Sequence, residues 1–199
     1  YKLLNMDIQR IQPIHLRTKL RTAAEAAEII SDNMVVASSG FTKSGDSKAV
    51  LAELATKALN NPFQITLITG ASLGYETDGV LVNANVLAKR MPFQSDPILR
   101  KAINEGKVLF VDQHLSETVE QLHNGHLPKI DVAIIEATSI LSDGSLVPTT
   151  SVGNSVSFAA LADKLIIEIN MAMREDLLGI HDIYLPQAYP NREGIPIIN

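Results

Sequence analysis

The chain has 199 residues, of which 46% are hydrophobic and 20% are charged, and this balance predicts one globular domain. Its 17 basic and 22 acidic residues give a net charge of −5, which disfavours nucleic acid and anionic membranes as partners and leaves a small molecule or another protein. The absence of cysteine excludes disulfides, a thiolate nucleophile and cysteine-based metal sites, and no apolar run approaches the roughly 20 residues of a membrane span. We therefore expect an intracellular, soluble protein.

The first half of the chain alternates between helical and strand-like patterns. Thr22 and Glu25 have the spacing of a capping box, which predicts the start of a helix that runs to Ile30. Short apolar runs predict strands, and apolar residues three and four apart predict helices. The further segments expected on these grounds are a strand at 34–38, a helix at 47–59 and a strand at 64–69.

The secondary structure of residues 78–93 is ambiguous from the sequence, and we expect a short helix there, followed by an edge strand at 87–90. The next helix should open at Ser95 or Asp96, because Pro97 then falls in its first turn. Gly106 stands where a glycine is expected just beyond the end of that helix.

Strand-like runs separated by helical segments continue in the second half. Ser116 is expected to cap a helix that closes at Gly125, and the polar stretch 142–145 predicts a hairpin turn. The remaining segments expected are strands at 108–112, 131–136 and 165–170 and a helix at 154–162.

Strands that are apolar on both faces and alternate with helices are typical of a mostly parallel sheet that is covered on both sides. The expected fold class is therefore α/β, in one domain that extends through about Asn170. The chain lacks an initiator Met and stops in the apolar, strand-like run 194–199, so we also expect it to be a piece of a longer protein.

Ligands of an open parallel sheet bind beyond the carboxyl ends of its strands, so the residues that follow each strand are the first candidates for a site. Polar residues stand at these places in segments 39–42, 69–72, 112–114, 136–138 and at 168 and 170. Strand ends are also polar simply because they meet water. Two of these loops carry glycines, which favours a binding site.

The loop from Gly40 to Ser47 has the G-x-x-x-x-G spacing of a phosphate-binding loop. The lysine of that motif is missing, because Asp46 stands where an ammonium would reach the phosphates, so a nucleoside triphosphatase is disfavoured. Two interpretations remain. The loop is either a tight strand-to-helix turn, or a glycine loop before a helix whose backbone N–H groups bind an oxyanion, a thioester carbonyl or a phosphate.

Other candidate groups give weaker signals. His123 and His126 are spaced to share a helix face as metal ligands, or to cap carbonyls at a helix end. Glu136 and Glu168 end apolar runs, where burial can raise the pKa of a carboxyl and make it a base or nucleophile, although pairing with a neighbouring Lys or a backbone amide is the commoner outcome. His181 is either a surface loop residue or a site residue.

Residues 151–155 form another loop of small residues before a helix, with Asn154 or Ser155 as the expected N-cap. In the functional interpretation, its amides and Asn154 face the same cleft as the loop of Gly40. A Ser–His–Asp triad is disfavoured because the chain has no G-x-S-x-G elbow.

Five motifs of this chain occur together, and in the same order, in a known family. They are Ser39-Gly40-Phe41-Thr42, Ile65 to Ser72, Val132 to Thr138, Val147 to Ser155 and Gly179 to Ile183. Along nearly its whole length the chain resembles the N-terminal half of the acetyl-CoA hydrolase/transferase family, the class I CoA transferases. The resemblance implies that residues 1–199 are the N-terminal domain of a two-domain chain, with a three-layer α/β/α fold around a mostly parallel sheet.

The resemblance also implies a mechanism. In such enzymes a glutamate attacks an acyl-CoA thioester, and a glutamyl-CoA thioester then passes CoA to a second acid. That glutamate lies beyond Asn199, so neither Glu136 nor Glu168 is the expected nucleophile, and no catalytic residue or metal ligand is expected in this segment. The CoA thioester is a substrate, and no tightly bound cofactor is expected.

The partners that the resemblance implies are an acyl-CoA, a small carboxylate, the C-terminal half of the same protein and further copies of the chain. The expected location is the cytoplasm, or the mitochondrial matrix in a eukaryote. The substrate-binding residues that it implies, as amide donors and positioning groups, are Gly40, Phe41, Thr42, Thr69, Gly70, Ala71, Ser72, Gly153, Asn154, Ser155 and His181.

The chain departs from its family in the first loop. Relatives tend to read G-F-T-G-A-G-x-P, whereas Lys43-Ser44 and Ser47 here replace the inner glycine and the proline. We expect a loop that is stiffer inside and less fixed at its exit.

The first hypothesis is the N-terminal domain of an acyl-CoA:carboxylate CoA transferase, incomplete for catalysis without its second half. An acyl-CoA hydrolase is the nearest alternative. A non-catalytic ligand-sensing domain that binds a phosphorylated sugar or CoA is a second, and a sugar-phosphate isomerase with Glu136 as base is a third.

Overall fold

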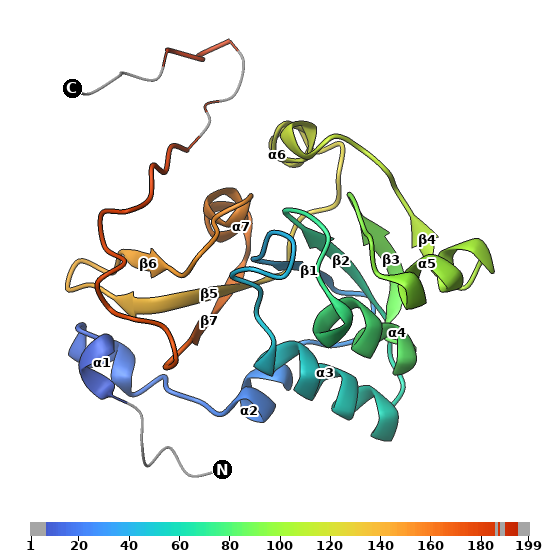
Figure 1. Ribbon diagram of the computed structural model, residues 1–199, viewed down its shortest axis with the longest axis horizontal. Helices are drawn as coiled ribbons and strands as arrows, with labels where there is room; N and C mark the ends of the chain where they lie inside the picture. Colours follow the sequence, from blue (N-terminus) through green and yellow to red (C-terminus); the bar gives the residue numbers. More distant parts are fainter. Residues whose placement is uncertain (1–6, 186, 188–189, 195–199) are drawn as a thin grey trace.

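Seven strands form one sheet in the computed structural model, which describes residues 7–185, 187 and 190–194 (Figure 1). The strand order is β4-β3-β2-β1-β5-β6, and β7 also pairs with β5. The strands are β1 (Val35–Ser38), β2 (Ile65–Thr69), β3 (Leu87–Met91), β4 (Leu109–Phe110), β5 (Val132–Ile140), β6 (Leu146–Pro148) and β7 (Lys164–Ile169). All pairings are parallel except that of β5 with β6, which confirms the mostly parallel sheet.

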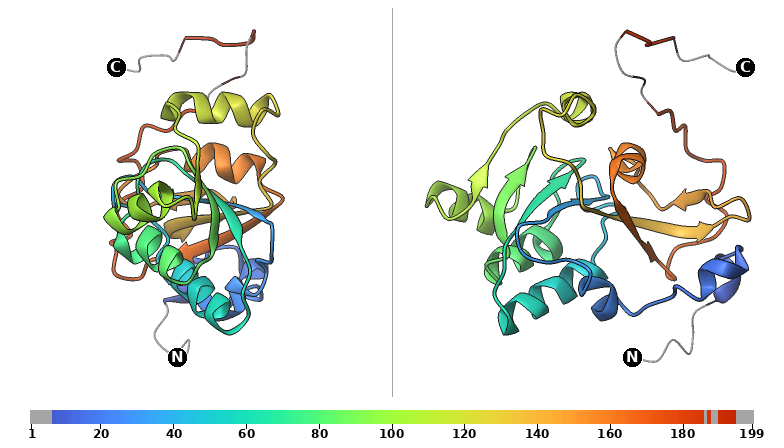
Figure 2. Two further views of the ribbon diagram at one scale, coloured as in Figure 1. Left: turned by 90° about the vertical axis from the view of Figure 1, so that its right-hand side faces the viewer. Right: turned by 180° about the vertical axis from the view of Figure 1, so that it is seen from behind.

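Helices cover both faces of this sheet (Figure 2). They are α1 (Ile14–Arg17), α2 (Ala23–Ala27), α3 (Ala49–Asn60), α4 (Val80–Asn83), α5 (Pro97–Asn104), α6 (Leu115–His123) and α7 (Ser155–Leu161), with a 3₁₀ turn η1 (Ile8–Arg10) and a π-helix η2 (Tyr75–Gly79). Helices α2 to α5 contribute to one buried cluster, and α6 and α7 contribute to a second. Two clusters on opposite faces confirm the three-layer α/β/α arrangement.

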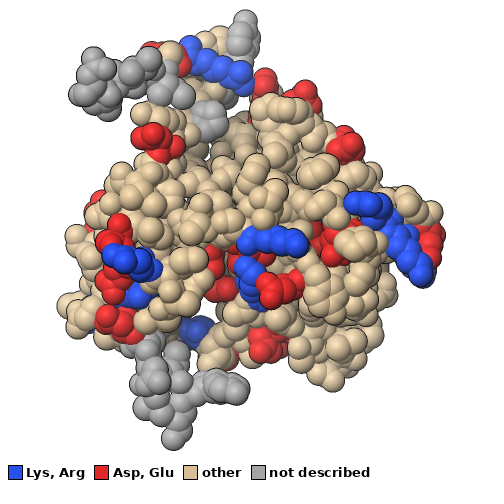
Figure 3. All heavy atoms as spheres, viewed as in Figure 1, with Lys and Arg blue, Asp and Glu red and all other residues tan. Residues whose placement is uncertain are grey.

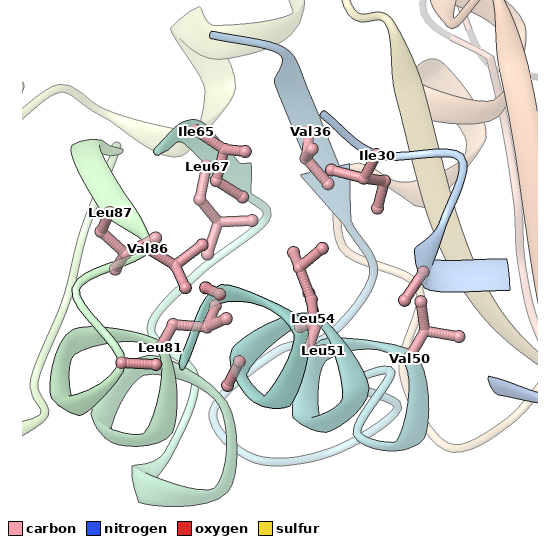
Figure 4. Close-up of a cluster of buried hydrophobic side chains, with 14 of the residues drawn as sticks. Ile30, Val36, Val50, Leu51, Leu54, Ile65, Leu67, Leu81, Val86 and Leu87 are labelled. Atoms are coloured by element: carbon pink, nitrogen blue, oxygen red, sulfur yellow. The ribbon is translucent and has the colours of Figure 1, made fainter. Parts of the chain in front are cut away.

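The residues of β1 explain why its sequence shows no alternation of apolar and polar side chains. Val36 belongs to the cluster under α3, whereas Val35 and Ala37 belong to the cluster under α7. Successive side chains of a strand point to opposite faces, and both faces are buried here. Figure 4 shows Val36 above Leu51 and Leu54 of α3.

Strand β3 lies inside the sheet, so the edge strand expected at 87–90 is a wrong prediction. Lys89 and Arg90 give this segment the charge of an edge strand, but Arg90 is fully buried and its guanidinium pairs with Asp78. Strand β3 is paired with both β2 and β4. The edge is the two-residue β4, which is shorter than the predicted strand and leaves Leu109 exposed.

The capping box that opens α2 is confirmed. Thr22 Oγ1 accepts the backbone amide of Glu25, and the Glu25 carboxylate accepts the amide of Thr22. The helix ends at Ala27 rather than at Ile30, because the next residues form tighter turns that lead the chain into β1. Asn33 completes this change of direction with a left-handed φ of 64°.

The start and end signals of α5 are also confirmed, because Asp96 caps its first amides and Gly106 follows it with a φ of 73°. Helix α6 differs from the prediction. It begins at Leu115, and its cap is His114 rather than Ser116, since the Nδ1 atom of His114 accepts the Ser116 amide.

The hairpin predicted at 142–145 is confirmed as the turn between β5 and β6. Strand β5 extends four residues beyond the predicted 131–136, and all nine of its residues are buried. None of the described helices is long and apolar enough to span a bilayer.

Beyond β7 the chain contains no further regular element in the described residues and runs along the sheet past β6 (Figure 1). Arg10 fixes the beginning of this segment, because its guanidinium donates to the carbonyl oxygens of Asn170 and Met173. Residues 195–199 of the strand-like run expected at 194–199 lie outside the described residues.

Candidate functional site

Three glycines from three different loops meet beside the sheet. Gly40 follows β1, Gly70 follows β2 and Gly153 precedes α7. A Cβ atom added to Gly70 would lie 2.9 Å from the amide nitrogen of Asn154 and 3.3 Å from the carbonyl oxygen of Gly40. A Cβ on Gly153 would lie 3.5 Å from the same carbonyl oxygen. The structure thus brings together the loops that the sequence singled out separately, at a spacing that suits glycine.

The tip of the first loop is a turn with two consecutive left-handed residues. Phe41 and Ser44 exchange backbone hydrogen bonds of 2.9 and 3.1 Å, and between them Thr42 and Lys43 have φ values of 47° and 70°. Two positive φ values are the pattern of a type I′ turn, which favours Asn-Gly. Thr42 and Lys43 therefore hold this turn at a strain of about 1–2 kcal/mol each.

Hydroxyl groups join the first loop to the third. Ser44 Oγ and Thr150 Oγ1 share a hydrogen bond of 2.6 Å, and Ser151 Oγ donates to the carbonyl oxygen of Ser44. Gly45, with a φ of 66°, leaves space for this contact, because a Cβ there would lie 2.5 Å from Ser151 Oγ. The two loops consequently form one unit.

A carboxylate of the protein occupies the amino end of α3. Glu168, near the end of β7, accepts the amides of Lys48 and Ala49 through Oε1 and that of Val50 through Oε2, each at 3.0 Å. The glycine-loop interpretation assigned amides at this helix start to a bound oxyanion, and for α3 that interpretation is wrong. Burial raises the pKa of Glu168, and the three N–H donors oppose this shift.

Asp46, which stands where a phosphate-binding loop has its lysine, is a buried residue of the first loop. Its Oδ1 accepts a hydrogen bond of 2.6 Å from Lys48 Nζ, and a Cβ on Gly40 would lie 2.6 Å from the Cβ of Asp46. Its Cβ is packed against Gly40, and its carboxylate pairs with Lys48, so the residue would repel a phosphate rather than bind it.

A buried ion pair fixes the second loop. Arg90 Nε lies 2.8 Å from Asp78 Oδ1, and both side chains are fully buried. Arg90 Nη2 also donates to the carbonyl oxygen of Ala71, and Asp78 Oδ2 accepts the amide of Leu73 at 3.2 Å. The pair therefore holds the loop at two points. Sequence reasoning missed it, because Arg90 stands beside Lys89 and the two charges suggested an edge strand rather than a buried partner.

The third loop connects to Glu136 and His181 through Thr149. His181 Nε2 donates to the Thr149 carbonyl oxygen at 2.6 Å, and Thr149 Oγ1 donates to Glu136 Oε2. Asn170 Nδ2 donates to the other carboxylate oxygen of Glu136 at 2.7 Å. Glu136 is thus hydrogen-bonded at both oxygens, by a hydroxyl and a side-chain amide rather than by the lysine or backbone amide expected for it. His181 is half-buried against the third loop.

The expected substrate-binding residues divide by exposure. The buried ones are Gly40, Thr69, Gly70, Ala71, Ser72 and Ser155. Phe41, Thr42 and Gly153 are exposed, and Asn154 and His181 are half-buried. Asn154 stands at the N-cap of α7 without a capping hydrogen bond from its side chain, which donates weakly to the Leu115 carbonyl at 3.4 Å.

Two further features lie apart from the loops. His123 is in the last turn of α6 with His126 just beyond it, and the described residues contain no group of three His, Cys, Asp or Glu side chains placed to hold a metal ion. A groove of about 390 Å³ has a mainly apolar lining from β7 and from the chain around Leu16, Ile29 and Ile140, and no residue of the three loops lines it.

The profile of the acetyl-CoA hydrolase/transferase N-terminal domain matches residues 6–191. The chain is 42% identical over 193 residues to succinyl-CoA:acetate CoA-transferase from Clostridium kluyveri, and 41% identical over 183 residues to propanoyl-CoA:succinate CoA transferase from Escherichia coli. These matches cover 96% and 89% of this chain but 36% and 37% of the relatives.

A third relative, acetyl-CoA hydrolase from Yarrowia lipolytica, is 35% identical over 203 residues, which are 95% of this chain and 38% of that protein. The chain therefore spans less than two-fifths of the length of these curated relatives.

Solved structures agree with the fold. RipA from Yersinia pestis matches with a TM-score of 0.64 and 18% identity, over 84% of this chain and 39% of that chain. Glutaconate coenzyme A-transferase from Acidaminococcus fermentans matches with a TM-score of 0.57 and 15% identity, over 74% and 68% of the two chains. At such identities the likeness shows the fold alone.

Proposed function

The chain belongs to the acetyl-CoA hydrolase/transferase family as its N-terminal domain, and from this premise we propose that it is part of an enzyme that transfers CoA from an acyl-CoA to a small carboxylate. The observation that carries the proposal is the likeness to two CoA transferases, at 42% and 41% identity over nearly the whole chain. The hydrolase from Yarrowia lipolytica is less similar, at 35%, so hydrolysis is the second candidate.

The proposed reaction proceeds through a glutamate that lies beyond this chain. Its carboxylate oxygen attacks the thioester carbonyl, the C–S bond breaks, and CoA leaves as a thiolate. The thiolate then attacks the glutamyl carbonyl of the resulting anhydride and releases the donor acid. The glutamyl-CoA thioester passes CoA to the second acid by the same two steps in reverse. A carboxylate is a weak nucleophile, so the route depends on oxyanion donors and on a site with little water.

This domain would supply surface and donors to that route. In this proposal the residues that contact the substrate are the exposed Phe41, Thr42 and Gly153 and the half-buried Asn154 and His181, because they reach the surface of the loops. The second loop, 69–72, is buried and held from beneath by the ion pair of Arg90, so its role would be to position the other two loops. The start of α3 would contribute no donor, because Glu168 occupies it.

The test is exchange by the full-length protein that contains this chain. Incubation with acetyl-CoA and succinate should give succinyl-CoA and acetate, and borohydride should inactivate the enzyme by reducing the glutamyl-CoA thioester. The isolated domain should be inactive, because the nucleophile is missing. CoA release that needs no acid would favour hydrolysis. Absence of exchange across several acids, together with sugar-phosphate binding, would refute the proposal.

A further inference from the structure

Lys43, at the tip of the first loop, carries a long basic side chain on a left-handed backbone. Its φ is 70°, a left-handed value that glycine adopts readily and a residue with a side chain adopts at a cost. A bulky residue in this region is an outlier. Strained residues of this kind persist at functional sites, where the strain is part of how a group is positioned.

The stem of Lys43 lies on the second loop. A Cβ atom added to Gly74 would lie 3.0, 3.1 and 3.2 Å from the Cγ, Cε and Cδ atoms of Lys43. The side chain therefore runs in contact with the backbone of Gly74 for most of its length. A lysine held in this way loses less conformational freedom when its ammonium binds a ligand.

The ammonium of Lys43 is available for such a ligand. The residue is exposed, and its ammonium makes no salt bridge with a carboxylate of the described residues. Lys48, the neighbouring base, is already paired with Asp46 at 2.6 Å. Near the middle of the face shown in Figure 3, basic side chains lie directly beside acidic ones.

We propose that Lys43 is a substrate-binding residue whose ammonium pairs with an anionic group of a bound substrate, either a phosphate of CoA or the carboxylate of the acid. This inference rests on the proposed function and adds to it a charged contact from the tip of the first loop. Ammonium–phosphate and ammonium–carboxylate pairs are the same chemistry, a charge-assisted hydrogen bond to an anionic oxygen.

The test compares three variants of the full-length enzyme. Lys43→Met removes the charge and keeps the stem, Lys43→Gly removes the whole side chain and relieves the left-handed backbone, and Lys43→Arg keeps a charge. A control, Lys101→Met, removes an exposed ammonium from α5. We expect Lys43→Met and Lys43→Gly to raise the KM of one substrate about tenfold, with kcat little changed, since hydrogen bonds to charged groups are worth at least that factor. Lys43→Arg should restore most of the binding.

Comparison of two thioester donors, acetyl-CoA and acetyl-pantetheine, identifies the anion that Lys43 binds. If Lys43 binds a phosphate, acetyl-pantetheine, which has none of the phosphates of CoA, should show no difference between wild type and Lys43→Met. If it binds the acid, the KM of the acid should rise with either thioester. Lys43→Gly should also unfold at a higher temperature than wild type, because the left-handed strain is relieved.

The outcomes separate this inference from the proposed function. CoA binding by calorimetry to wild type and Lys43→Met adds a readout that does not need turnover. A wild type that exchanges CoA while both variants keep every KM and the CoA affinity within twofold overturns the role of Lys43 alone. A wild type that neither exchanges nor binds CoA overturns both.

Discussion

Replacement of Gly70 by alanine tests whether the three glycine loops are in contact as closely as the structure indicates. The new Cβ would lie 2.9 Å from the nitrogen of Asn154, 3.3 Å from the oxygen of Gly40 and 3.4 Å from the Cα of Gly153. All three are backbone atoms, so no flexible side chain can move aside. Overpacking of this kind costs about 1–3 kcal/mol. A loss of about 2 kcal/mol lowers the Tm of a chain of this size by roughly 4–8 °C.

The assay is urea denaturation of the purified chain, followed by circular dichroism, with two control variants. Gly194 has no atom within 4 Å of an added Cβ and no left-handed φ, so Gly194→Ala should change the free energy of unfolding by less than about 0.5 kcal/mol. Gly106→Ala meets no neighbour but adds a Cβ at a φ of 73°, and should cost about 1–2 kcal/mol from the backbone alone.

These controls separate crowding from backbone strain, because Gly70 carries no left-handed φ. Equal free energies of unfolding for Gly70→Ala and Gly194→Ala would refute the reasoning, since the loops would then accept a side chain at no cost. In the full-length enzyme, Gly70→Ala should also lower exchange activity, whereas Gly106→Ala should leave it unchanged.

Two further predictions concern buried charges. Asp78→Asn leaves the guanidinium of Arg90 buried without its counter-charge and should lower the free energy of unfolding, measured in urea, by about 3–5 kcal/mol. The apolar double variant Asp78→Leu/Arg90→Met should lower it by less, and equal losses of unfolding free energy in the two variants would contradict this. Because burial raises the pKa of Glu168, the folded state binds more protons than the unfolded state, so the free energy of unfolding should fall as pH rises above the usual carboxyl range. Glu168→Gln should remove this contribution to the slope of unfolding free energy against pH, whereas the exposed control Glu117→Gln should keep it. An unchanged slope in Glu168→Gln would show that Glu168 is not the group responsible.

Local signals in the sequence predicted much of the fold, because they act over a few residues. The capping box of Thr22 and Glu25 lies within one helical turn, and Asp96 caps the amides that follow it directly. The apolar runs of the central strands predicted a parallel sheet, since burial on both faces removes alternation. Strand β3 was misplaced at the edge because the partner of Arg90 is brought to it only by the fold.

The candidate site, like the fold, could be predicted from the sequence only in part. The glycine loops are visible in the sequence. Two of them follow strands whose carboxyl ends share one edge of the sheet, whereas the third precedes a helix and was assigned to the same cleft only in the functional interpretation. Three features were not visible in the sequence. Glu168 accepts amides at the start of α3 that lie 118–120 positions earlier, which only the fold brings to it. The turn at Thr42 and Lys43 is left-handed although neither residue is glycine, and the hydrogen bond from Arg90 to Ala71 depends on the register of β3.

The contact between Glu168 and the start of α3 also sets an order of events during synthesis. The carboxylate belongs to β7, the last strand of the sheet, so α3 emerges from the ribosome 118–120 residues before the group that satisfies its first amides. At translation rates of about 5–20 residues per second, this interval lasts roughly 6–24 s. The first glycine loop leads directly into α3, so the nascent chain completes this corner of the site only when its final strand has joined the sheet.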